Sequence, residues 1–188
     1  MILGGYFPKL VVPRPKWLAE PRVSEVCSVS NCVSAGPEDW TYRWIHNSLG
    51  WFNTLADAWS VVPPGDVERY RMFAYRLAPS FYRRGTAERL LVPEDVRPEP
   101  LPAELDSLGF DTYSKSMDSI LGPECSPLSC NGLAPEFQTN PHCLLDTLDE
   151  ACKAASRFSL EQPEPGDYYV AEVLQQRQED RGPGATAR

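Results

Sequence analysis

The sequence lacks the features that mark most enzyme and membrane classes. No apolar run of about 18 residues is present, so no segment is long enough for a membrane-spanning helix. Histidine occurs only at His46 and His142, which leaves few residues for a histidine-based catalytic centre. Glycine-rich phosphate loops, the G-x-S-x-G motif and H-E-x-x-H are all missing. The common nucleotide-binding, hydrolase and zinc-protease classes therefore lose their support.

A recognisable secretion signal is also missing. Pro8 and Lys9 interrupt the stretch that a signal peptide would keep apolar. We therefore expect a cytoplasmic protein whose cysteines stay reduced.

Positive charge is scarce in the second half of the chain. Lys and Arg number 18 against 26 Asp and Glu, which gives a net charge of −8. Residues 93–188 contain 7 basic and 18 acidic side chains. Such a surface repels phosphate, which disfavours nucleic acid, and attracts a basic protein partner. Glu94, Asp95 and Glu99 are the candidate partner-binding residues.

One segment runs against this acidity. Residues 69–89 contain six arginines interleaved with aromatic side chains. This pattern is found in single-strand nucleic-acid binders, and it is also typical of a strand with solvated arginines and buried aromatics. The acidic second half favours the strand, because it offers these arginines partners within the protein.

The periodicity of apolar residues predicts an α+β fold. Thr147 and Glu150 form the capping box of a helix whose apolar face ends at Phe158. Further helices are expected from Pro37 through Trp40 and Trp44, and over Leu55–Val62. Strands are expected over 6–12, 23–29, 70–77, 89–92, 110–116 and 168–174. Because no regular βαβ rhythm appears, we expect a mainly antiparallel or mixed sheet with about three helices packed on it.

The length of 188 residues is that of one domain. We expect a single domain over residues 1–176, with a disordered tail over 177–188. Four prolines between positions 93 and 102 predict an extended connector inside that domain.

Six cysteines include two pairs with the same C-x₄-C spacing. Cys27 and Cys32 form one pair, and Cys125 and Cys130 form the other. Four thiolates brought together would bind zinc and tie the two halves of the chain to each other. Small buried cysteines without a metal are the simpler interpretation. We therefore expect no cofactor and keep a zinc-stabilised binding module as an alternative.

A second alternative is enzymatic. Arg76 lies on one predicted strand, Ser114 and Ser116 on another, and Glu172 on a late strand. This order of Arg, Ser and Glu resembles the triad of one class of ADP-ribosyltransferases. The resemblance implies that Arg76 holds the dinucleotide phosphates, Ser116 braces the site and Glu172 stabilises the oxocarbenium-like centre.

The sequence as a whole favours a non-enzymatic role. Catalytic motifs are few, the charge is lopsided, and abundant Trp and Tyr suit a protein interface. We expect a small acidic protein that binds another protein, as an immunity protein or an adaptor does.

Overall fold

The computed structural model describes residues 1–43, 45–86, 88–91, 98–102, 105–116 and 125–177. It shows a single α+β domain built on a six-stranded antiparallel sheet. The strands of this sheet are β1 (Ile2–Lys9), β4 (Arg71–Leu77), β5 (Ser80–Tyr82), β6 (Arg89–Leu91), β7 (Leu105–Lys115) and β8 (Asp167–Gln176). A short second sheet pairs β2 (Val12–Pro13) with β3 (Glu25–Val26).

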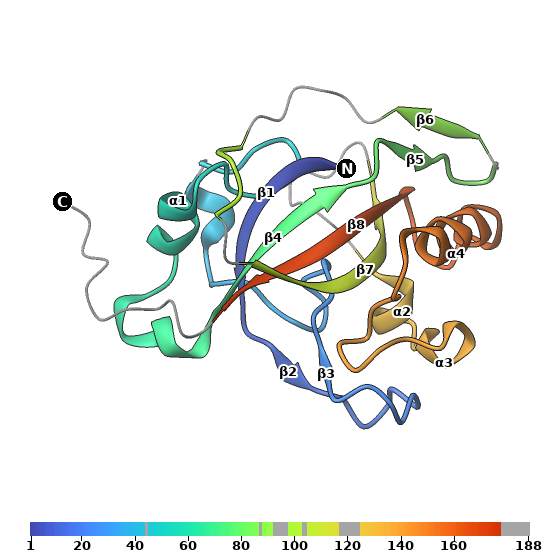
Figure 1. The fold of residues 1–188 in the computed structure, drawn as a ribbon, viewed down its shortest axis with the longest axis horizontal. Coiled ribbons are helices and arrows are strands. Elements are labelled where there is room, and N and C mark those ends of the chain that lie inside the picture. Colours follow the sequence, from blue (N-terminus) through green and yellow to red (C-terminus); the bar gives the residue numbers. More distant parts are fainter. Residues whose placement is uncertain (44, 87, 92–97, 103–104, 117–124, 178–188) are drawn as a thin grey trace.

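Strand β8 is the centre of the large sheet (Figure 1). β7 pairs with it along its whole length, from Leu105 opposite Gln176 to Lys115 opposite Asp167. β4 pairs with β8 on its other side and carries β1 at the sheet edge. Pro8 lies on this edge strand, where the missing N–H of proline costs no internal hydrogen bond.

Alternate side chains of β8 enter two different cores. Tyr169, Ala171 and Val173 belong to a core that also contains Ala58 of α1 (Leu55–Ser60). Tyr168 and Val170 belong to a second core beneath α4 (Leu148–Glu161). Side chains along a strand point alternately to the two faces of the sheet, so each face of the sheet is covered by a core.

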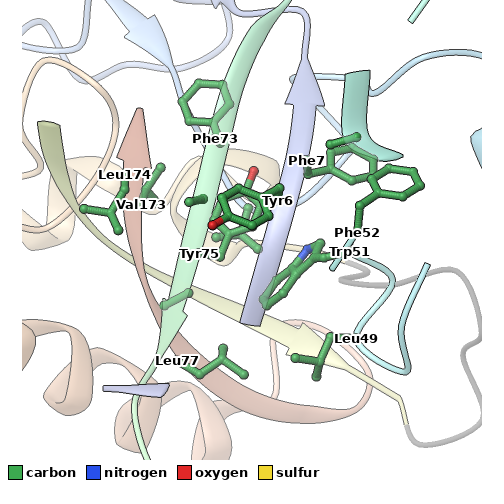
Figure 2. Close-up of a cluster of buried hydrophobic side chains, with 14 of the residues drawn as sticks. Tyr6, Phe7, Leu49, Trp51, Phe52, Phe73, Tyr75, Leu77, Val173 and Leu174 are labelled. Atoms are coloured by element: carbon green, nitrogen blue, oxygen red, sulfur yellow. The ribbon is translucent and has the colours of Figure 1, made fainter. Parts of the chain in front are cut away.

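The first core is dominated by aromatic rings. Figure 2 shows Trp51 and Phe52 lying against strands β1 and β4. The ring of Trp51 lies 4.8 Å from that of Tyr75. A Cβ on Gly4 would come within 2.3 Å of the Trp51 ring, so this close approach requires glycine.

Two predicted helices are confirmed together with their caps. Thr54 accepts a hydrogen bond from the Asp57 N–H at 2.9 Å and begins α1. Thr147 and Glu150 form the expected capping box of α4. Phe158 is fully buried beneath α4, as the apolar spacing predicts.

Two predicted elements are wrong. The helix expected from Pro37 is only a 3₁₀ turn over Trp40–Arg43, and it follows Asp39, whose φ of 59° interrupts a helix. The strand expected over 23–29 shrinks to Glu25–Val26, because the backbone beyond it bonds to buried side chains instead of a neighbouring strand. Trp44, connector residues 92–97 and tail residues 178–188 lie outside the described part of the chain.

Several short elements carry no strong sequence pattern. They are β5, the 3₁₀ helix Pro64–Arg69, α2 (Pro127–Cys130) and α3 (Ala134–Phe137). Helix α2 matters most for function, because it carries two of the six cysteines at or beside its ends.

Candidate metal centre

Two loops with the same C-x₄-C spacing meet on one side of the sheet. The first cysteine loop, residues 27–32, reads C-S-V-S-N-C and follows β3. The second cysteine loop, residues 125–130, reads C-S-P-L-S-C and contains α2. The second loop begins where the Ser114 N–H of β7 donates to the carbonyl of Cys125 at 2.7 Å.

Three sulfur atoms from these loops form a compact group. The Sγ atoms of Cys32, Cys125 and Cys130 all lie within 4.8 Å of one another. Cys32 and Cys125 are 3.2 Å apart, well beyond the S–S bond length of about 2.05 Å. Cys32 is exposed and the other two are half-buried, so the group lies at the molecular surface. We call these three residues the thiol cluster.

Asp111 of β7 holds both cysteine loops. Its carboxylate accepts a hydrogen bond from the Ser28 hydroxyl at 3.0 Å and from the Ser126 hydroxyl at 2.7 Å. The Val29 N–H adds a third bond at 2.7 Å. Ser28 and Ser126 each directly follow the first cysteine of their loop, so the two loops use one carboxylate in the same way. Burial raises the pKa of Asp111.

Lys9 of β1 holds the first cysteine loop from the other side. Its buried Nζ donates to the carbonyls of Ser28, Val29 and Ser30 at 2.6, 2.7 and 2.5 Å. Burial lowers the pKa of Lys9 to about 7. Three consecutive carbonyls thus face one side chain, which explains why the chain leaves the strand conformation after Val26.

The three thiols differ in acidity. A hydrogen bond from the Cys130 thiol lowers the pKa of Cys32. Burial raises the pKa of Cys125 to about 12, and the bond to Cys32 raises that of Cys130. Cys32 is therefore the first of the three to form a thiolate, which is the form that binds metal.

Cys27 takes no part in the thiol cluster. Its Sγ lies 3.7 Å from a Glu25 oxygen and 4.0 Å from His142 Nδ1. The same Glu25 oxygen bonds to Arg71 at 2.9 Å and to His142 Nδ1 at 3.0 Å. The Arg71 charge already balances Glu25, so a cation gains little here.

The same geometry also weakens Cys27 as a nucleophile. A catalytic relay needs the base to contact the thiol with one ring nitrogen and the acid with the other. Here Cys27 and Glu25 both face Nδ1 of His142. Burial raises the pKa of the Cys27 thiol further from neutrality.

The residues of the transferase resemblance are only partly brought together. Arg76 and Glu172 form a salt bridge across β4 and β8. The other Glu172 oxygen accepts a hydrogen bond from Ser107 at 2.8 Å. Ser116 instead follows Lys115, which pairs with Asp167, about 17 Å along β8 from Glu172 at the usual rise per residue.

The predicted partner-binding acids divide in a similar way. Glu94 and Asp95 lie outside the described residues. The Glu99 carboxylate accepts the Leu55 N–H at 2.7 Å, at the first residue of α1. This carboxylate therefore has a role within the fold.

Sequence reasoning identified the cysteines and missed the residues that hold them. Nothing near Lys9 or Asp111 marks either as unusual, since an isolated lysine or aspartate is normally solvated. One signal was available: a serine follows the first cysteine in both loops. This repeated Cys-Ser step predicts a shared hydrogen-bond partner.

Comparison with known proteins adds no further assignment. No protein-family model, curated protein or solved structure matches this chain. Among the described residues, no helix is both long and apolar enough to cross a membrane.

Proposed function

We propose that this protein is a zinc-binding module in which Cys32, Cys125 and Cys130 hold one metal ion. The convergence of three thiols from two loops, with Cys32 and Cys125 93 residues apart, carries this proposal. The ion stabilises the fold by connecting the first cysteine loop to the second. Zinc binding is the alternative that the cysteine spacing left open, and it replaces the expectation of a protein without a cofactor.

The chemistry of the donors supports zinc. Thiolates favour zinc over magnesium or calcium, which prefer oxygen ligands. Sulfur atoms around a tetrahedral zinc ion lie about 3.8 Å apart, given Zn–S bonds of about 2.3 Å. In the thiol cluster the Cys32 and Cys125 sulfurs are 3.2 Å apart and all three sulfurs lie within 4.8 Å of one another, so these distances lie on either side of the zinc value.

The surrounding hydrogen bonds also support a built site. Asp111 and Lys9 fix the backbone of the first cysteine loop, and Asp111 fixes the start of the second. Residues that orient ligands in this way typically strengthen metal binding 10- to 100-fold, roughly. The two loops are thus positioned by buried charged groups rather than by the metal alone.

Elemental analysis of the purified full chain tests the proposal. The protein is prepared under reducing conditions, reconstituted with zinc and freed of excess metal. We expect about one zinc per chain in the wild type and in Cys152→Ser, whose cysteine lies on α4 outside the cluster. Cys130→Ser should retain far less.

Two results would contradict the proposal. Wild-type protein that holds no more metal than Cys130→Ser would remove the site. Stoichiometric iron or copper after expression in unsupplemented medium would keep the site and overturn the choice of zinc.

We also propose a protein partner, as the composition predicts. Trp17 supports this second proposal, because it is 54% exposed and its ring lies 3.9 Å from where a Cβ on Gly132 would be, just beyond the second cysteine loop. Exposed Trp is a frequent anchor of protein interfaces.

Affinity capture with the wild type, Trp17→Ala and the control Leu160→Ala tests this proposed partner surface. A partner kept by the control and lost by Trp17→Ala is expected, and equal capture by all three would exclude this surface.

A further inference from the structure

We infer that the metal ion keeps one coordination position for a ligand from outside the chain, and that this ligand is the thiolate of a small thiol. The inference rests on the proposed function, since it concerns the same thiol cluster. It changes the expected role of the ion from a purely structural link to a binding site.

The number of ligands in the thiol cluster points to an open position on the ion. Structural zinc sites are closed by four protein ligands, whereas sites that bind a further molecule use three. Within the part of the chain that the structure describes, the cluster contains three ligating side chains. Cys27, which its spacing offered as a fourth, is turned toward Glu25 and His142.

The exposure of the thiol cluster to solvent also supports an outside ligand. Cys32 is exposed, while Cys125 and Cys130 are half-buried. An ion held by these sulfurs therefore lies near the surface on the Cys32 side. A ligand from solvent would approach the ion on this side.

The softness of the three sulfur donors favours a thiolate as the outside ligand. Three thiolates make the site soft, and a fourth thiolate completes the Cys₄-type set that zinc commonly adopts. The complex with three thiolates is already negative, which would oppose another anion. The Nζ of Lys9 binds three carbonyls of the first cysteine loop, and in its protonated form it offsets part of that charge.

Binding of the thiol is a balanced exchange. The S–H bond of the incoming thiol breaks, its sulfur forms a bond to the ion, and the proton passes to solvent. No oxidant or reductant is required. The bound sulfur stays a thiolate at neutral pH, where a thiol in solution is mostly protonated.

Cobalt substitution of the full chain gives the test. Cobalt(II) in place of zinc shows sulfur-to-metal charge-transfer absorption whose intensity follows the number of bound thiolates. Glutathione is then titrated into the cobalt protein, with S-methylglutathione as the matched probe without a thiol. We expect a saturable rise of about one third with glutathione, because four thiolates replace three, and no change with S-methylglutathione.

Each other outcome has a distinct meaning. No cobalt bound at all would remove the proposed function together with this inference. Cobalt bound with no response to glutathione would leave the zinc module standing and overturn the open position. Absorption typical of four thiolates before any thiol is added would show that a fourth cysteine of this chain fills the position. Dimers that form with the metal would show that a cysteine of a second copy fills it. Either result also overturns the open position.

Discussion

Asp111 is the residue on which both cysteine loops depend. It is fully buried and accepts bonds from two serine hydroxyls and a backbone N–H of those loops. A carboxylate in this position is stable because every bond supplies part of the solvation lost on burial. Its role came from tertiary structure, since the donors belong to two loops that are far apart in the sequence.

Asp111→Asn should weaken both the fold and the site. The amide has a single acceptor oxygen, so the two buried donors that face the other oxygen lose their partner. We expect a loss of about 2 to 4 kcal/mol in the free energy of unfolding, measured by urea titration. Zinc affinity should fall at least about tenfold. Asp106→Asn is the control, because this exposed carboxylate forms a surface salt bridge with Arg177. This variant should unfold at the same urea concentration as the wild type.

Lys9 makes stability depend on pH. Its pKa falls from an ordinary 10.5 to about 7 on folding, because burial disfavours the ammonium. Between pH values of about 7 and 10.5, the unfolded chain keeps the Lys9 proton that the folded chain has released. Stability therefore rises with pH across this window and is lost as pH falls toward about 7.

Comparison with Lys9→Met tests this dependence. Urea titrations of both proteins across the same window cancel the contributions that other groups share. The stability of the wild type relative to the variant should increase as pH rises from about 7. Parallel curves for the two proteins would show that Lys9 keeps its charge throughout.

At the scale of elements, the side-chain caps and most apolar patterns predicted the structure, while the first-turn pattern at Pro37 and the alternation over 23–29 did not. The Thr147 and Glu150 box and the Thr54 cap both form where the sequence places them. The alternating pattern over 23–29 does not give a strand of that length. A cap needs only neighbours in sequence, whereas a strand needs a partner strand that the fold must supply.

Helix α4 offers a graded test of this element. Thr147→Ala should reduce the free energy of unfolding by about 1 kcal/mol, because one N-terminal N–H loses its acceptor. Phe158→Ala should cost about 3 to 5 kcal/mol, since the ring is buried against Phe137 and Tyr168. Urea titration measures both, and Leu160→Ala, at an exposed position, is the control. An equal effect of all three substitutions would contradict the packing described for α4.

At the scale of the whole molecule, the proposed zinc ion would link parts of the chain that the sheet already brings close. Removal of zinc should therefore lower stability without changing the fold. If free zinc exceeds its dissociation constant about 1,000-fold, the bound ion adds about 4 kcal/mol. Thermal unfolding with and without a chelator measures this.

Variants separate the metal from other effects of the chelator. The wild type and Cys152→Ser should melt at a lower temperature when zinc is removed. Cys130→Ser should melt low in both conditions, because it has lost one of the three ligands. A chelator that lowers the melting temperature of Cys130→Ser as much as that of the wild type would show that another metal site is responsible.

The sequence by itself determined the α+β class, the mainly antiparallel sheet and two capped helices. These depend on periodicity and capping, which act over a few residues. Tertiary structure decided which cysteines meet. It separated Cys27 from Cys32 and joined Cys32 to the second cysteine loop, because Lys9 and Asp111 fix the backbone between them. Spacing along the chain carries no information on such long-range hydrogen bonds, so only the folded arrangement places the three thiols together.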